Sequence, residues 1–359
     1  GLPSSAILCD YRTMAAHLDW TDIGRQVRDA RLAAGMSQQD LADAVGLERS
    51  KVAKVETGAR RLDALELVRF SAALRVSMDY LLRPRPLVLS HRAGLLTEDT
   101  DTEIARESQR LDIELVTWLH EVRQLIELEV LTPKPLLLYP DRVETKADAR
   151  TAAHWLRQRL GYGDQPITSL MNACERAGQF VLVTDLPGDG ASLVDGGVAA
   201  AVVSVTGDPG RRRATAAHEL GHLVLGDEYS SDLGLHASRQ EREEVIDAFA
   251  AEFLLPIQVV QRAASAESLS REALIRLAAN YRTSWTLALR QAEQAGVLTP
   301  ETTRRWSISN PTKAEIQEAV GWAPLPDLES VRVPPSFATA VMTAWRRNLI
   351  TNARAVELM

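Results

Sequence analysis

Apolar residues recur at helical spacing along most of this chain, and one unbroken apolar run separates two such stretches in its second half. The run at 198–205 is short and rich in valine and alanine, which is typical of a buried strand. Apolar residues then follow one helical face over 214–224, between a start signal at Asp208-Pro209 and a stop at Gly226. A second helix is expected at 241–256, with acidic residues first and an apolar face after them. This half of the chain should therefore contain both helices and strands.

Three short helices are expected near the N-terminus. The second spans 37–45, the third spans 48–56, and Gly46-Leu47 forms a tight turn between them. The helix lengths and the position of the turn correspond to a helix-turn-helix layout, with Gly58 ending the third helix. The apolar face of the first helix consists of Ile23, Val27, Ala30 and Leu32.

A long helix is expected between these two regions. Apolar residues recur at helical spacing over 103–131, after an acidic cluster at 98–102 that suits a helix start. The helix serves either as a spacer or as a dimerising seam, since the pattern is too short to favour a coiled coil over ordinary packing. Towards the C-terminus, 271–298 is expected to form two short helices and 324–359 a small, mostly helical tail.

Composition is that of an ordinary globular protein. The 359 residues suffice for two or three domains, and a net charge of −7 argues against a protein that coats nucleic acids indiscriminately. Cys9 and Cys174 are too few for a disulfide framework, and no apolar run has the length of a membrane span. Residues 1–20 lack the layout of a signal peptide, and we interpret them as a leader or a remnant of cloning. A cytoplasmic location without membrane contact is expected.

Residues 218–222 carry the strongest chemical signal in the chain. They form a His-Glu-x-x-His pattern, so on a helix His218 and His222 lie on one face, one turn apart. Two imidazoles are thereby within reach of one zinc ion, with Glu219 beside the water that the metal would bind. The alternative is an amphipathic helix with two surface or core histidines. The buried strand before this helix and the acidic helix after it favour the metal site.

A catalytic zinc ion needs a third protein ligand, which the helix at 241–256 can supply. Glu243 and Asp247 are four residues apart and share a face. Glu243 could ligate the metal while Asp247 accepts a hydrogen bond from the far nitrogen of a ligand histidine and fixes its tautomer. Glu241 and Glu244 remain alternative ligands, although Glu244 lies about 100° around the helix from Glu243. These acids also suit the positive N-terminal end of a helix.

Two segments, 212–226 and 243–256, resemble the ImmA/IrrE family of zinc metallopeptidases. The first carries the His-Glu-Leu-Gly-His helix, and the second is similar to the family pattern ExxAN-x-FAAxLLMP, with Ile246-Asp247 in place of Ala-Asn and Leu255-Pro256 in place of Met-Pro. The resemblance covers roughly residues 145–300.

This resemblance implies a zincin-like α+β domain, a zinc ion and a protein substrate, often a repressor. His218, His222 and Glu243 are the implied metal ligands, with Asp247 behind them and Glu219 as the catalytic residue. It also implies a helix at 147–160, a strand at 181–184 and a turn into a strand at 189–193. The residue that stabilises an oxyanion is not evident from the sequence, and Tyr229, Tyr281 and Arg212 are candidates.

The N-terminal pattern closely resembles the Cro/phage-repressor (XRE) type of helix-turn-helix domain, over about 21–83. This resemblance implies an all-α fold that binds an operator in double-stranded DNA. A homodimer would be needed for tight binding. A protein-interaction domain without DNA binding is the alternative, because fold analogy alone does not establish function. The matching residues are Arg31, Gly35, Ser37, Gln38, Leu41, Ala42, Gly46, Val52, Glu56 and Gly58.

The candidate DNA contacts lie on and around the third helix. Arg49 is the best base reader because a guanidinium pairs with guanine in the major groove. Ser50, Lys51 and Lys54 are expected beside it on the outward face, while Val52 and Val55 face inward. Phosphate contacts are expected from Gln38, Arg60 and Arg61.

We therefore predict a multidomain, mainly α protein. It would regulate transcription and cleave a specific repressor or partner protein that controls stress or mobile-element genes. The alternative is a transcription regulator whose zinc domain is a sensor or structural module without peptidase activity. The expected divisions are a leader at 1–20, the DNA-binding domain at 21–83, a helical linker or dimerisation segment at 84–144, the peptidase domain at 145–300 and a helical tail at 301–359.

Overall fold

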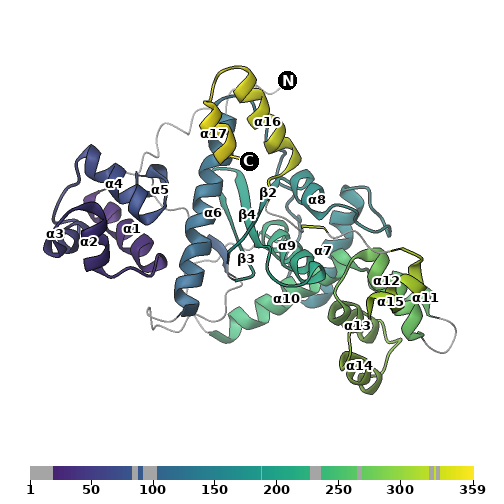
Figure 1. The fold of residues 1–359 in the computed structure, drawn as a ribbon. Helices are drawn as coiled ribbons and strands as arrows, with labels where there is room; N and C mark the ends of the chain where they lie inside the picture. Colours follow the sequence, from purple (N-terminus) through teal and green to yellow (C-terminus); the bar gives the residue numbers. More distant parts are fainter. Residues whose placement is uncertain are drawn as a thin grey trace. The chain divides into compact units, whose positions relative to one another are not determined.

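The computed structural model describes residues 19–82, 88–91, 103–186, 188–226, 236–264, 269–322, 327–328 and 332–359, with the backbone alone for 88–91, 103–105 and 236–239. The chain divides into two compact units, one formed by 1–86 with 95–117 and the other by 87–94 with 118–359. Helices dominate both, which confirms the expected multidomain, mainly α class (Figure 1).

Five helices form the first unit, together with the first part of α6. Three of them begin with a capping box, in which Asp19, Ser37 or Asp63 accepts a hydrogen bond from the third backbone N–H of its helix. Val27, Leu41 and Val52 are fully buried between the helices, as the apolar pattern predicted. The helices are α1 Trp20–Ala33, α2 Gln38–Val45, α3 Arg49–Glu56, α4 Ala64–Leu74 and α5 Met78–Leu82.

Helix α6 (Glu103–Glu127) contributes to both units, with the change at Trp118. It ends earlier than the predicted 131. The amide of Leu131 bonds back to the carbonyl of Leu125, and Glu129 has a left-handed φ of 55°, so the chain reverses direction after the helix. From Trp118 onward the helix lies along the sheet, on the side opposite α9 (Figure 1).

The second unit is built on a four-stranded sheet with the order β1-β3-β4-β2. Strands β2 and β4 are parallel, while β3 is antiparallel to both of its neighbours. Strand β4 is buried along its whole length, as expected for a strand covered on both faces. The strands are β1 Val88–His91, β2 Gln179–Thr184, β3 Gly190–Asp195 and β4 Val198–Ser204. Three match the predicted strands, whereas β1 was not predicted.

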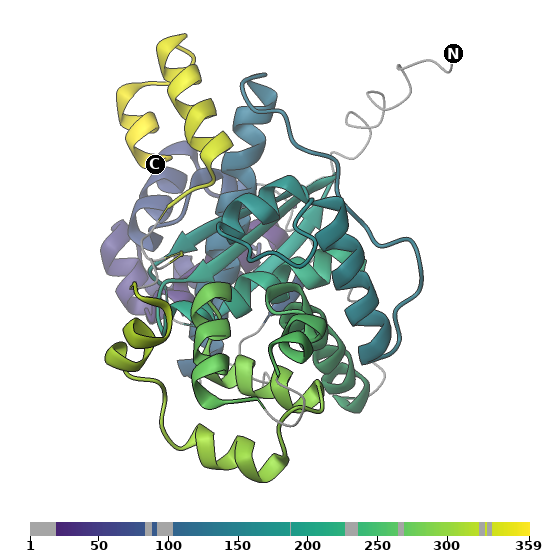
Figure 2. The same cartoon turned by 90° about the vertical axis from the view of Figure 1, so that its right-hand side faces the viewer.

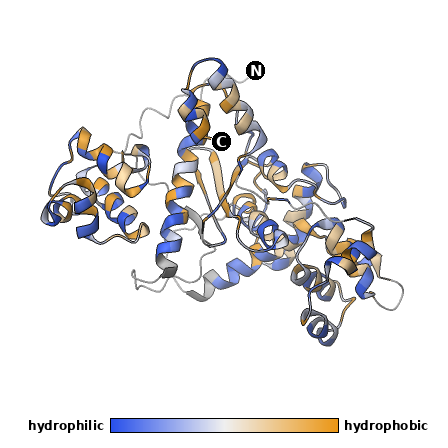
Figure 3. Cartoon of the chain, viewed as in Figure 1, coloured by the Kyte–Doolittle hydropathy of each residue, from blue (hydrophilic) through white to orange (hydrophobic). Residues whose placement is uncertain are grey.

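Alternate strand residues divide between the two faces of the sheet. Val181, Ala199 and Ala201 point into the main core, where Leu220 of α9 and Phe249 of α10 meet them. Figure 2 shows the helices that surround this face, and Figure 3 shows the strands as mainly hydrophobic next to helices of mixed hydropathy. The helices that complete this core are α7 Lys146–Arg159, α8 Leu170–Arg176, α9 Pro209–Val224, α10 His236–Leu254 and α11 Ile257–Ala263.

The C-terminal quarter of the chain is mainly helical and packs in two places. Four of its helices form a cluster beside α11, in which α12 contacts α15 and α13 contacts α14. The last segment returns to the sheet, because Arg332 bridges to Val183 on the outer side of β2 and Phe337 packs against Trp118. The helices are α12 Arg271–Tyr281, α13 Trp285–Gln294, α14 Pro300–Ser307, α15 Lys313–Val320, α16 Pro335–Arg346 and α17 Asn352–Glu357. None of the described helices is long and apolar enough to cross a membrane.

Candidate metal centre

Helix α9 carries the His-Glu-x-x-His residues in the interior of the second unit. It begins where Asp208 accepts hydrogen bonds from the backbone N–H groups of Gly210 and Arg211, with Pro209 at the first helical position. The helix packs on the sheet on one side and against α10 on the other. His218, Glu219 and His222 are consequently at most 1% exposed.

The two histidines and one carboxylate converge on a single point. The Nε2 atoms of His218 and His222 lie 3.1 Å apart, as expected for imidazoles one helical turn apart. Oε2 of Glu243 lies 3.1 Å from the first nitrogen and 3.9 Å from the second. One ligand atom from each of these three side chains lies within 4.8 Å of the other two. Such a grouping of two nitrogens and one carboxylate oxygen suits a divalent metal ion.

Asp247 lies behind His218, one turn along α10 from Glu243. Its Oδ1 is 2.8 Å from Nδ1 of His218, the ring nitrogen that does not face the other two ligands. An imidazole N–H at Nδ1 that donates to this carboxylate leaves the lone pair at Nε2 free for a metal. The contact therefore holds the ring in the orientation and tautomer that metal binding requires.

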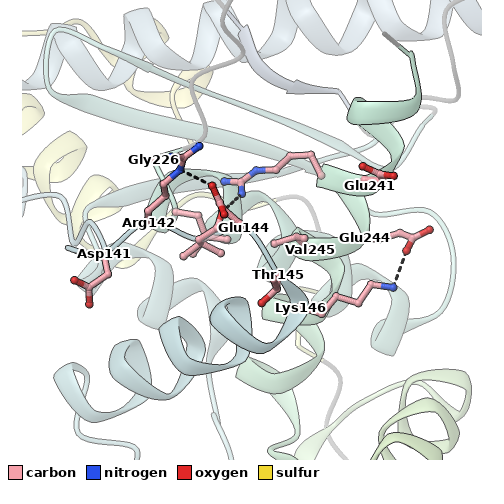
Figure 4. A pocket seen from close by; sticks show the side chains of 12 residues that line it. Asp141, Arg142, Glu144, Thr145, Lys146, Gly226, Glu241, Glu244 and Val245 are labelled. Atoms are coloured by element: carbon pink, nitrogen blue, oxygen red, sulfur yellow. Dashed lines mark hydrogen bonds and ion pairs between the residues drawn. The ribbon is translucent and has the colours of Figure 1, made fainter. Parts of the chain in front are cut away.

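The alternative acids point elsewhere. Oε2 of Glu244 lies 2.6 Å from Nζ of Lys146, and both side chains are about half exposed at the surface. Glu241 and Glu244 line a separate hollow of about 680 Å³ beside the N-terminal part of α7. Figure 4 shows this hollow, with the Lys146–Glu244 ion pair at its edge. None of His218, His222 and Glu243 lines it.

A close approach of the two helices brings the acids to the histidines. A Cβ atom added to Gly221 would lie 3.0 Å from Cγ2 of Ile246 and 3.0 Å from Cδ1 of Phe249. A side chain at this position would require those two side chains of α10 to shift by a few tenths of an ångström. The glycine in the His-Glu-x-x-His segment thus leaves room for the close packing of α10 on α9.

Glu219 is fully buried, and its two oxygens differ in environment. Oε2 accepts a hydrogen bond of 2.7 Å from the hydroxyl of Ser192 on β3. Oε1 has no hydrogen-bond partner among the residues that the structure describes. A Cβ atom at Gly190 would lie 3.5 Å from Oε1 and only 2.7 Å from Cγ2 of Thr215, so the absence of a side chain at this point of β3 leaves room for the carboxylate.

Sequence reasoning missed the residues of the sheet that hold Glu219. Besides Ser192, Gln179 on β2 donates from Nε2 to the backbone carbonyl of Glu219 at 3.0 Å. A signal was present, because Gly190 and Ser192 interrupt the apolar face of a strand that is otherwise buried. Polar residues on a buried strand need hydrogen-bond partners, and here the partner is the carboxylate of the neighbouring helix.

The oxyanion candidates are engaged in other contacts. The hydroxyl of Tyr281 donates to the carbonyl of Asp164 at 2.5 Å, and Nη1 of Arg212 donates to the carbonyl of Val205 at 2.6 Å. Tyr229 lies outside the described residues. Tyr281 and Arg212 therefore stabilise backbone segments of the domain.

In the first unit, α3 presents an exposed polar face. Arg49, Ser50, Lys51 and Lys54 are exposed, while Val52 and Val55 are buried as expected. This arrangement leaves four of the candidate DNA contacts on one accessible helix.

The three other candidate contacts differ from one another. Arg61 is exposed, with its guanidinium 6.0 Å from the centre of the Trp20 ring. Nη2 of Arg60 donates to Glu66 at 2.5 Å, and this hydrogen bond raises the pKa of the Arg60 guanidinium. Gln38 is half-buried and donates from Nε2 to Glu56 at 2.9 Å. Arg60 and Gln38 thus have partners within the domain.

Glu56 is also bound by the buried guanidinium of Arg31. Nε donates to Oε1 at 2.6 Å and Nη2 donates to Oε2 at 3.2 Å, which is a two-point contact. Arg31 further donates to the carbonyl of Met36 at 2.8 Å. This network ties α1, α3 and the start of α2 together.

Comparisons with known proteins agree with this division of the chain. Residues 27–81 match the family model described as helix-turn-helix, and residues 200–292 match the model described as IrrE N-terminal-like domain, a peptidase family. No curated protein matches the chain. The protein therefore joins a DNA-binding domain to a domain of a zinc-dependent peptidase family. More narrowly, the first is of the XRE type and the second of the ImmA/IrrE type, as their sequence motifs predicted.

Two solved structures that the comparison found cover different shares of the chain. The restriction-modification controller protein C.AhdI from Aeromonas hydrophila is 33% identical over 18% of this chain and 96% of its own, with a TM-score of 0.17. PlcR from Bacillus thuringiensis, solved with the peptide PapR7 and DNA, is 11% identical over 94% of this chain and 91% of its own, with a TM-score of 0.18.

Proposed function

We propose that this protein is a DNA-binding regulator with a zinc-dependent peptidase domain. The domain cleaves a specific repressor or partner protein and thereby controls stress or mobile-element genes. The observation that carries the proposal is the convergence of His218, His222 and Glu243 next to the buried carboxylate of Glu219. A purely structural zinc site uses four protein ligands, whereas three protein ligands leave the fourth coordination position for water or substrate.

Zinc fits the donor atoms that this chain offers. Two imidazole nitrogens and one carboxylate oxygen, with a second carboxylate behind one ring, form a common ligand set of catalytic zinc. Burial of the unpartnered Oε1 of Glu219 also needs a polar group nearby, because an unsatisfied carboxylate oxygen is costly in the interior. His218, His222 and Glu243 would hold the ion. When bound, zinc supplies a Lewis acid that polarises a peptide carbonyl and activates water.

Glu219 is the group that moves the proton. Oε2 is held by Ser192, so Oε1 is the atom that takes a proton from the attacking water and passes it to the leaving amine. Asp247 keeps the ring of His218 fixed while this happens, and Gly221 leaves room for the close packing of α10 on α9.

The helix-turn-helix domain supports a role on DNA. The exposed residues of α3 would enter the major groove, with Arg49 reading bases and Lys51 and Lys54 contacting bases or phosphates. Arg61 remains accessible for a phosphate contact. We propose double-stranded operator DNA as one partner, a homodimer as the binding form, and the cytoplasm as the location.

The test compares wild-type protein with Glu219→Gln. Both are loaded with zinc, incubated with a proteome from the source cell, and scored for new N-termini by mass spectrometry. We expect a small set of new N-termini with the wild type and none with Glu219→Gln, while the zinc content of the two is equal. Equal sets of N-termini would refute the role of Glu219, and no cleavage by either protein would favour a sensor or structural zinc domain.

A further inference from the structure

The outer edge of β3 is occupied by a segment that the chain itself supplies. Strand β1 pairs with β3 in antiparallel fashion, with Ser90 opposite Ser192 and His91 opposite Ala191. In the sequence, β1 follows the last helix of the DNA-binding domain after residues 83–87. It nevertheless belongs to the compact unit that contains the metal centre.

This edge is next to the candidate catalytic carboxylate. Ser192, the register partner of Ser90, donates its hydroxyl to Oε2 of Glu219, and Gly190 lies beside Oε1. Helix α9 contacts β1 as well as β3. A backbone that pairs with β3 at this position therefore runs past the site where Glu219 acts.

An extended peptide binds most readily where a sheet has an edge with unused backbone donors and acceptors. The sheet has two edge positions, and the outer side of β2 already carries the bridge from Arg332. Without β1, the edge strands of the sheet would be β3 and β2. Among the described residues, β3 contacts the carboxylate of Glu219 through Ser192, whereas Gln179 of β2 contacts only its backbone carbonyl. The edge of β3 is thus the place where a protein segment could pair with the sheet and reach the site.

We propose that residues 88–91 act as an intrachain competitor, holding the edge of β3 that a protein substrate must occupy as an extended strand. The inference rests on the proposed peptidase function and specifies its regulation. Binding of substrate then requires that β1 leaves β3. Apparent substrate affinity is lowered by the fraction of molecules in which the edge is occupied.

The pairing of β1 is suited to displacement. It is four residues long and its register shifts between Val88 and Ser90. By contrast, β3 and β4 pair without interruption over six residues. Each paired residue adds little to the free energy of strand pairing, and short edge strands are only marginally stable. A substrate with a longer regular strand can therefore replace β1.

The experiment uses full-length protein with Glu219→Gln, so that no cleavage disturbs binding. Leu89→Pro with Ser90→Pro removes two backbone N–H groups from β1, while Leu89→Ala with Ser90→Ala keeps them and serves as the matched control. The probe is a fluorescein-labelled peptide with the sequence of residues 87–94, followed by fluorescence anisotropy. Hydrogen exchange of the amides of 190–195 is measured in parallel.

The proline variant should bind the peptide at least about tenfold more tightly than the alanine control. Its β3 amides should exchange faster, and added peptide should restore their protection. Equal affinity and equal exchange in both variants would overturn the proposal, even if zinc-dependent cleavage of other proteins is found. Zinc-dependent cleavage of wild-type chain between residues 82 and 103, absent from Glu219→Gln, would also overturn it, because the strand would then be a substrate.

Discussion

The hydroxyl of Ser192 donates a hydrogen bond of 2.7 Å to Oε2 of Glu219, and both residues are buried. The contact joins β3, the second strand in the sheet order, to the helix that carries both histidines. Of the two carboxylate oxygens of Glu219, it leaves Oε1 without a hydrogen-bond partner among the described residues. In the proposed mechanism, Ser192 is thus a positioning residue that leaves Oε1 of Glu219 available for proton transfer.

We expect Ser192→Ala to lower kcat by about tenfold or more, because a hydrogen bond to a charged group contributes roughly 1.5–3 kcal/mol. KM should change little, since the hydroxyl contacts Glu219 and not the substrate. Ser192→Thr retains a hydroxyl and should recover most of the loss. The measurement is steady-state cleavage of the substrate found in the proteome screen. A serine with a merely structural role would give equal kcat in the alanine and threonine variants.

Asp247 provides the second prediction, which concerns metal affinity. Its carboxylate orients the ring of His218 through Nδ1, so Asp247→Ala should weaken zinc binding by about 10- to 100-fold. Affinity is measured by competition with a chromophoric chelator. Glu244→Gln is the matched control, because Glu244 lies on the same helix but pairs with Lys146 at the surface. Equal loss in both variants would mean that charge on α10, and not the contact to His218, determines affinity.

The sequence was sufficient for the parts of the site that depend on helical geometry. His218 and His222 are four residues apart, and any α-helix places such residues on one face. The sequence left Glu244 as an alternative to Glu243, because the third ligand depends on which face of α10 packs against α9. The structure brings Glu243 to the histidines and pairs Glu244 with Lys146.

Contacts between segments distant in sequence could not be predicted in the same way. Ser192 and Glu219 are separated by 27 positions, and their contact depends on the strand order and on the packing of α9. Strand β1 has no apolar alternation long enough to mark it, and its pairing partner lies about a hundred residues away. Arg60 was predicted to contact phosphate because it is basic and follows α3. The sequence did not reveal that Arg60 forms an ion pair with Glu66 of the next helix.

Glu56 provides a test of the DNA-binding domain. Its side chain is 4% exposed and that of Arg31 is 9% exposed, so removal of the carboxylate leaves a buried guanidinium without its counter-charge. We expect Glu56→Ala to destabilise the domain by about 3 kcal/mol, and Glu56→Gln by less because hydrogen-bond acceptors remain. Hydrogen exchange of the α1 and α3 amides in the full chain measures the change. Unchanged exchange in Glu56→Ala would show that the Arg31–Glu56 ion pair makes no net contribution to the stability of the domain.

Glu252 connects stability to pH. This residue, near the end of α10, accepts hydrogen bonds from the backbone of Ile257 and from Gln291, and Nε2 of His154 lies 2.9 Å from its Oε1. Burial raises the pKa of the Glu252 carboxyl above its ordinary 4.5, against the opposing effects of the Ile257 amide, His154, Gln291 and Arg150. The carboxyl group of Glu252 therefore holds its proton more tightly in the folded protein than in the unfolded chain.

A raised carboxyl pKa gives stability that is complete below the unfolded value and is lost as pH rises through the folded value. The unfolding free energy of the wild type, minus that of Glu252→Gln, should therefore fall as pH rises from 4.5 toward neutrality and then level off. Urea unfolding of both full-length proteins across this range measures the difference, which removes the effect of titrating groups that do not interact with Glu252. If the glutamine itself changes the unfolding free energy by an amount independent of pH, the whole plot of this difference against pH shifts, but its slope stays the same. A difference that increases with pH would mean that the contacts to Ile257, Gln291 and His154 outweigh burial and lower the pKa of Glu252.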